Sequence, residues 1–249
     1  MTLPLTAELL LAACIFLGAA LYSSVGHAGA SSYLALMALF GVPAATMRPT
    51  ALVLNVLVAS LASVRYTRVG LFRWRVLWPV LLGAVPMAVL GGAVHLPGAI
   101  YRPLVGAILL LAAARLLWPV PIQAMRETRD PPIFPAALAG AVIGILSGLT
   151  ATGGGIFLSP LLLFLGWCEV RPASGVAAVF ILCNSAAGLA GNLASVGHLP
   201  ADLLLFAAAA LLGGVVGTTL GIGRFATPAI IKALGAVLVI AGLKLFDLF

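Results

Sequence analysis

The sequence predicts an all-α polytopic membrane protein with two homologous halves and 8 to 10 membrane helices. Of its 249 residues, 63% are hydrophobic and only 8% are charged, and the mean hydropathy is +1.23. A soluble domain carries about a quarter charged residues, so six acids and thirteen bases cannot give this chain a water-facing surface. The apolar runs are long and unbroken, which indicates helices rather than the short alternating strands of a membrane barrel.

The apolar segments follow the same order in both halves. In the first half they cover residues 5–22, 33–40, 50–64, 76–94 and 103–118. In the second half they cover residues 134–149, 156–165, 173–195, 201–220 and 228–246. We therefore divide the chain into a first repeat (1–118), a proline-rich linker (119–133) and a second repeat (134–249).

The second segment of each half is too short to be a full span, because crossing a bilayer takes about 20 helical residues. Two topologies remain open. If the short segments dip in and return, the chain has eight spans and parallel halves. If they cross in a partly unwound form, it has ten membrane segments and inverted halves. The distribution of basic residues slightly favours the inverted arrangement.

A break rich in small polar residues precedes each short segment. The first reads Ser-Ser-Val-Gly-His-Ala-Gly-Ala-Ser-Ser (23–32), and the second reads Thr-Ala-Thr-Gly-Gly-Gly (150–155). Interrupted hydrophobic segments at matched positions are the best sequence pointer to a transporter's binding site. Helix N-termini after such breaks offer free N–H groups that suit an anion, although small residues also occur where membrane helices simply pack. The candidate binding residues in the breaks are Gly26, His27, Gly29, Ser31, Ser32, Thr152, Gly153, Gly154 and Gly155.

An Arg-Pro pair follows each short segment, at Arg48-Pro49 and Arg171-Pro172. We expect each pair to begin a long helix. A guanidinium there would attract or bind an oxyanion, and the alternative is an anchor at the membrane interface. The repetition makes both arginines candidates for the binding site.

Three further polar residues lie within or between the apolar segments. His27 in the first break is a candidate to bind substrate or to carry a proton. Asn55 and Asn184 lie within apolar helices, where an amide needs a partner and either joins helices or lines the transport path. We include both amides in the candidate site.

The acidic residues, Glu8, Glu127, Asp130, Glu169, Asp202 and Asp247, all lie outside the apolar runs or at their ends. No carboxylate is therefore expected in mid-membrane, which argues against a cation site and fits an anionic substrate. The chain has no P-loop and no metalloprotease or nucleophile-elbow motif, so we predict no enzyme activity, no cofactor and no metal. Cys168, beside Glu169, is the cysteine expected to meet solvent.

The net charge of +7 does not indicate a nucleic-acid partner, because the basic residues cluster in short connections between apolar runs. One such connection holds Arg65, Arg68, Arg73 and Arg75. Short, basic connections mark the cytoplasmic side of a membrane. The expected location is therefore the inner (cytoplasmic) membrane, as a multi-pass protein in the lipid bilayer.

The segment Gly153-Gly154-Gly155-Ile156-Phe157-Leu158-Ser159-Pro160-Leu161-Leu162 resembles the glycine signature of the TauE/SafE sulfite exporter family. The duplicated arrangement and the Arg-Pro pairs are also similar to that family, over nearly the whole chain. The resemblance implies transport of small anions such as sulfite or organosulfonates. The first break departs from the family pattern by having His27, Ala28 and Ala30 where glycine is more usual.

We therefore expect a secondary transporter that binds a small anion between the two breaks and works by alternating access. A passive anion channel is the first alternative, and a membrane-embedded lipid-processing enzyme is the second. The sequence leaves open the identity of the anion, the direction of transport, proton coupling and homodimer formation.

Overall fold

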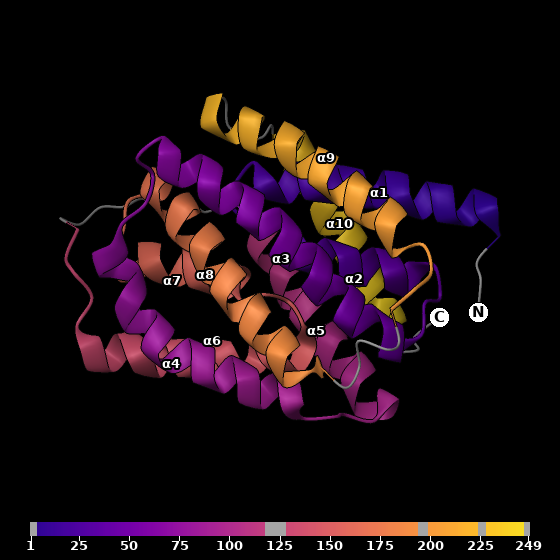
Figure 1. Ribbon diagram of the computed structural model, residues 1–249, viewed down its shortest axis with the longest axis horizontal. Coiled ribbons are helices and arrows are strands. Elements are labelled where there is room, and N and C mark those ends of the chain that lie inside the picture. The colour runs from indigo at the N-terminus through magenta and orange to yellow at the C-terminus, as the bar shows by residue number, and fades with distance from the viewer. Residues whose placement is uncertain (1–3, 118–127, 194–198, 224–227, 247–249) are drawn as a thin grey trace.

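The computed structural model describes residues 4–117, 128–193, 199–223 and 228–246, and within these ranges it contains ten helices and no strand (Figure 1). The first half of the chain forms α1 (Leu5–Ser23), α2 (Ala30–Leu39), α3 (Ala44–Arg68), α4 (Trp74–Ala93) and α5 (Gly98–Leu117). The second half forms α6 (Ile133–Thr150), α7 (Gly155–Phe164), α8 (Val170–Gly191), α9 (Leu203–Gly223) and α10 (Pro228–Lys244). The predicted all-α class is confirmed, whereas most of the linker lies outside the described residues.

Six helices in the described ranges are long and apolar enough to cross a membrane, namely α1, α3, α4, α6, α8 and α9. The helices α2 and α7 have ten residues each. They correspond to the two segments that were predicted to be too short for a full span. In Figure 1, α1 and α6 begin at opposite ends of the molecule. This is the arrangement that inverted halves require.

The two Arg-Pro pairs occupy different places in their helices. Arg171 lies in the first turn of α8, whereas Arg48 lies in the second turn of α3, which already begins at Ala44. The helix starts earlier because the carbonyl of Pro43 accepts the N–H groups of Thr46 and Met47. The apolar run therefore predicted the start of α8 closely but placed the start of α3 too late.

Glycines join the two halves by close backbone contact. On α6, Gly140, Gly144 and Gly148 face α4 so closely that a Cβ at each would collide with a carbonyl oxygen of Val80, Ala84 or Ala88. On α9, Gly213, Gly217 and Gly221 face α1 in the same way, against Phe16, Ala20 and Ser24. Small residues at every fourth position allow this approach in membranes, where packing rather than water expulsion drives helix association. The first helix of each half is thereby paired with the fourth helix of the other half.

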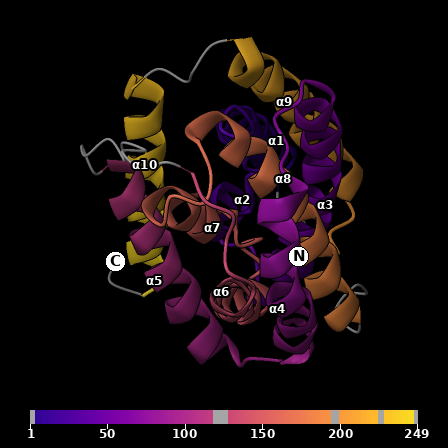
Figure 2. The same ribbon diagram turned by 90° about the vertical axis from the view of Figure 1, so that its left-hand side faces the viewer.

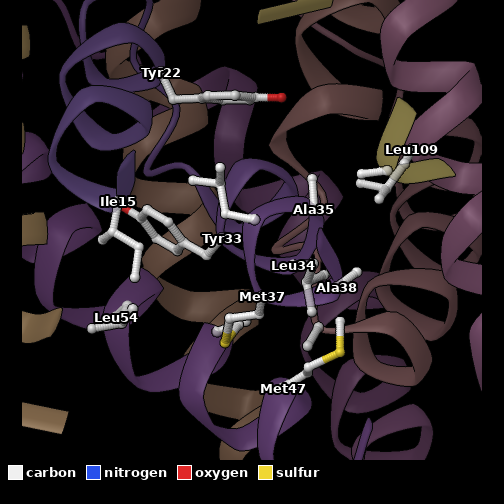
Figure 3. Close-up of a cluster of buried hydrophobic side chains, with 14 of the residues drawn as sticks. Ile15, Tyr22, Tyr33, Leu34, Ala35, Met37, Ala38, Met47, Leu54 and Leu109 are labelled. Carbon is white, nitrogen blue, oxygen red and sulfur yellow. The ribbon is translucent and has the colours of Figure 1, made fainter. Parts of the chain in front are cut away.

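The short helix α2 is enclosed on all sides, since every residue from Ala30 to Ala38 is buried. Figure 3 shows its side chains Tyr33, Leu34 and Met37 packed among Ile15 of α1, Leu54 of α3 and Leu109 of α5. Figure 2 shows α2 and α7 towards the middle of the molecule, between α5 and α10 on one side and α3, α4 and α9 on the other.

The helix α7 is less enclosed than α2. Only Gly155, Leu158 and Leu162 of α7 are buried. An apolar cavity of about 220 Å³ separates it from α5 and is lined by Leu111, Ala112, Ile156, Phe157 and Pro160. The two short helices thus differ in how firmly their surroundings hold them.

The close glycine contacts between α6 and α4 should contribute to the thermal stability of the protein. We expect Gly144→Ala to lower the thermal unfolding midpoint of the purified protein, because the new Cβ has to push α6 away from the carbonyl of Ala84, at a cost of about 1–3 kcal/mol. Gly98→Ala at the start of α5 is the matched control, since a Cβ there would meet no atom within 4 Å. Equal midpoints for the two variants would contradict this view of the helix contact.

Candidate functional site

Both breaks turn the chain through left-handed backbone conformations. Gly26 (φ 81°) lies three residues after the end of α1 and Gly29 (φ 111°) precedes α2, while Gly153 (φ 76°) and Gly154 (φ 77°) precede α7. These values favour glycine, because a side chain is strained there. The exception is Ala151 (φ 64°), which ends α6 in the same conformation and is fully buried. A non-glycine residue held in this region stores local strain, a feature that is common at functional sites.

Side chains from α3 satisfy the backbone of the first break. The Tyr66 hydroxyl donates to the carbonyl of Ser23 at 2.8 Å, at the C-terminus of α1. Asn55 Oδ1 accepts the N–H of Ala30 at 3.2 Å, at the start of α2, and Asn55 Nδ2 donates to Ser185 Oγ of α8 at 2.8 Å. The amide of Asn55 therefore holds the break and also joins the two halves.

The second break is held in a related way. Asn184 Nδ2 donates to Ser147 Oγ at 2.7 Å and to the carbonyl of Gly153 at 3.4 Å. The hydroxyls of Thr150 and Thr152 lie 3.0 Å apart. Each asparagine thus supports the break of its own half, in the helix-joining role that was one of the two expected for them.

The three consecutive glycines of the second break are also needed because there is no room for a side chain at these positions. A Cβ at Gly153 would collide with the amide of Asn55, one at Gly154 would lie 3.0 Å from Asn184 Nδ2, and one at Gly155 would collide with Ile181. Gly26 in the first break packs just as closely on the backbone of Ser174 in α8. Each break therefore presses against a helix of the opposite half, and a larger residue at Gly26 or Gly153 would push the halves apart.

A small polar cavity, here called the central cavity, lies between the two breaks. Its volume is about 10 Å³, which is room for roughly one water molecule. It is lined by Tyr22, His27, Ala28, Gly29, Ala30, Ser31, Asn55, Thr152, Gly155, Ile156 and Ile181. The sequence expectation that residues of both breaks come together is met by this set.

A larger cavity, here called the vestibule, lies beside the first break and has a volume of about 170 Å³. Its polar lining consists of Ser24, His27, Tyr66, Ser159, Arg171 and Ser174. His27 lines both the vestibule and the central cavity. Its Nε2 lies 3.2 Å from Ser159 Oγ of α7, so this pair forms part of the wall between the two spaces.

Arg48 is buried and engaged with backbone. Its guanidinium donates to the carbonyls of Val94 (2.8 Å), Gly91 (2.7 Å) and Gly92 (2.9 Å) at the C-terminus of α4, and to Gly148 of α6 (2.8 Å). A cation at a helix C-terminus satisfies its unpaired carbonyls and its negative end. These contacts indicate a structural role, and Arg48 is not among the residues that line either cavity.

The structure divides the remaining candidates into three groups. His27, Gly29, Ser31, Asn55, Thr152 and Gly155 line the central cavity. Arg171 lines the vestibule and is exposed. Gly26, Ser32, Gly153, Gly154 and Asn184 line neither cavity and shape or support the breaks instead. Substrate binding by any of these residues stays a prediction.

Sequence reasoning missed Tyr22 and Ser159. Tyr22 directly precedes the first break and lines the central cavity, and Ser159 lies within the glycine signature just before Pro160. Cys168 was expected at the surface but is fully buried, because it belongs to a hydrophobic cluster with residues of α4, α6, α7 and α8. Burial raises the pKa of its thiol to about 11, so it is protonated and unreactive at neutral pH.

Comparison with known proteins settles the family. The model for the family "Sulfite exporter TauE/SafE" matches residues 10–245. The chain belongs to the TauE/SafE family. It is also 37% identical over 242 residues to "Probable membrane transporter protein y4hK" of Sinorhizobium fredii, covering 94% of this chain and 96% of that protein. No solved structure matches the chain. The family and the name of this relative support a membrane transporter.

Removal of the Asn55 amide tests how the first break is held. We expect Asn55→Leu to lower the free energy of unfolding by about 1–3 kcal/mol, because the Ala30 N–H and the Ser185 hydroxyl lose their buried partner. Ser60→Ala on the same helix is the control, since the Ser60 hydroxyl bonds only to its own helix at Val56. Denaturant unfolding of both variants in one detergent gives the comparison.

Arg48→Gln should reduce thermal stability in the absence of any substrate, because it leaves several of the four carbonyls, three of them in buried hydrogen bonds, without a donor. Arg171→Gln should not, because Arg171 is exposed and has no hydrogen bond or ion pair with another described residue. If Arg48→Gln melts at the wild-type temperature but binds anions more weakly, Arg48 has the binding role that the sequence suggested.

Proposed function

We propose that the protein carries small anions, of the sulfite or organosulfonate type, across the inner membrane by alternating access. The observation that carries the proposal is the convergence of two helix N-termini on one cavity. Ser31 of α2 and Gly155 and Ile156 of α7 line the central cavity, and so does Ala30, whose N–H is already bonded to Asn55. The first N–H groups of a helix have no partner within it and carry partial positive charge, which favours an anion.

The chemistry of the cavity walls supports the same assignment. The side chains of Tyr22, Ser31 and Thr152 are hydroxyl donors, and no carboxylate lines the cavity. The family description names sulfite, a compact oxyanion whose oxygens accept hydrogen bonds from such donors. Proton coupling remains an expectation for His27, which is the titratable side chain shared by both cavities.

A carrier fits the observed cavities better than a passive channel does. A channel needs a continuous wet path, whereas the central cavity is about 10 Å³ and the His27–Ser159 contact lies between it and the vestibule. Sulfite does not fit into this space, so binding requires movement. The helix α7 is the element with room to move, because few of its residues are buried and an apolar cavity lies beside it.

Transport in proteoliposomes tests the central cavity. We expect Ser31→Ala and Thr152→Val to raise the half-saturating concentration for sulfite by about tenfold each, because each removes one hydrogen bond to a charged group. Thr218→Val is the matched control, since Thr218 is buried but its hydroxyl bonds within α9. Sulfite trapped on the far side should accelerate uptake, as a carrier exchanges its cargo.

Wild-type kinetics in both cavity variants would remove the central cavity from the mechanism. Flux that never saturates and shows no acceleration by trapped sulfite would instead favour the passive channel.

A further inference from the structure

The vestibule is larger than the central cavity and has the exposed Arg171 in its lining. It has about 170 Å³ against about 10 Å³, so a sulfonate-sized anion fits in the vestibule but not in the central cavity as it stands. The His27–Ser159 contact lies between them. An anion in the vestibule therefore occupies a place of its own, before it reaches the central cavity.

Within the described residues, the positive charge of Arg171 in the vestibule is not neutralised by a neighbouring carboxylate. Arg73 pairs with Glu169 at 3.0 Å and Arg75 lies 3.7 Å from Asp130, so the two acids near the start of α8 are already engaged. Arg171 makes no ion pair or hydrogen bond with any other residue in the described part of the chain, and no carboxylate is among the residues that line the vestibule. A guanidinium in this setting is a suitable donor for an oxyanion.

Two of the hydroxyl groups in the vestibule already donate hydrogen bonds to backbone carbonyls and are therefore not available to an anion. The Tyr66 hydroxyl is committed to the carbonyl of Ser23 and the Ser24 hydroxyl to that of Leu21. Ser174, one helical turn after Arg171 on α8, also lines the vestibule, and within the described residues its hydroxyl makes no hydrogen bond. Residues three apart on a helix lie on the same face, so the side chains of Arg171 and Ser174 can both donate hydrogen bonds to one anion.

We propose that the vestibule is a second anion-binding site, in which Arg171 and Ser174 hold an oxyanion in front of the wall formed by His27 and Ser159. The proposal rests on the proposed function only in taking an anion as the cargo. It assigns Arg171 to a waiting position outside the central cavity rather than to the site between the breaks.

Thiol labelling at position 174 tests the proposal. Cys14, Cys168 and Cys183 are replaced by alanine and Ser174→Cys is introduced. The labelling rates of an anionic (sulfonatoethyl) and a cationic (trimethylammonioethyl) methanethiosulfonate are then compared, each divided by its rate with a free thiol in solution. We expect a preference for the anionic reagent on the order of tenfold, since a charged cleft concentrates counter-ions to about this extent.

Three variants assign the preference to Arg171. Arg171→Gln should reduce the ratio of the anionic to the cationic labelling rate to about one. Arg171→Lys should keep most of the preference for the anionic reagent, because the charge remains. Arg68→Gln, at the exposed end of α3 and outside the vestibule lining, should leave it unchanged. Ethanesulfonate should slow labelling in a saturable manner with Arg171 present and should have no such effect in Arg171→Gln.

Several results would overturn the proposal. These are equal rates for the two reagents, a preference that survives Arg171→Gln, or a thiol at position 174 that neither reagent reaches. The test is independent of the central cavity, because Thr152→Val should leave the preference at position 174 unchanged. If the preference holds while Ser31→Ala and Thr152→Val transport like the wild type, the central cavity fails and the vestibule site stands.

Discussion

The structure depends on satisfying backbone polar groups at two helix breaks that lie inside the protein. Unpaired N–H and C=O groups are costly at membrane depth, so irregular backbone is tolerated there only where protein or a wet cavity supplies partners. Tyr66 and Asn55 supply them at the first break, and Asn184 does so at the second. Ser31 at the start of α2 and Gly155 and Ile156 at the start of α7 line the central cavity, while the N–H of Ala30 is bonded to Asn55. The central cavity thus lies at the points where the scaffold interrupts the chain and begins the two short helices.

Close packing places these supports where the breaks need them. The glycines of α6 and α9 bring backbones of opposite halves together, and Gly153 brings the second break against Asn55 of the first half. The halves are nevertheless unequal. The helix α2 is wholly buried, whereas α7 borders an apolar cavity and carries Ser159 on the wall of the vestibule. The same scaffold therefore fixes one short helix and leaves the other freer.

The sequence predicted the helices and the meeting of the breaks well, because hydropathy and glycine placement reflect local constraints that a bilayer makes severe. It could not separate Arg48 from Arg171, since both precede proline after a short apolar run. Their roles diverge through distant contacts: Arg48 meets carbonyls of α4 and α6, and Arg171 meets a cavity. Ser159 and Tyr66 were missed for the same reason, because only the fold brings them beside His27 and the end of α1.

The contrast between the two arginines also bears on how a transport cycle would proceed. On the vestibule side, Arg171 is exposed beside an open cavity, and on the other side Arg48 ties the end of α4 to α6 through four hydrogen bonds. In a low-dielectric interior each of those bonds is costly to break without a replacement. Among the side-chain hydrogen bonds between described residues, α7 contributes the His27–Ser159 contact, and it borders an existing cavity, although its Leu158 and Leu162 are buried against α4 and α8. For the proposed alternating access we therefore expect opening on the vestibule side to be the easier step, and opening at the Arg48 end to require another partner for the guanidinium, either water or the anion itself.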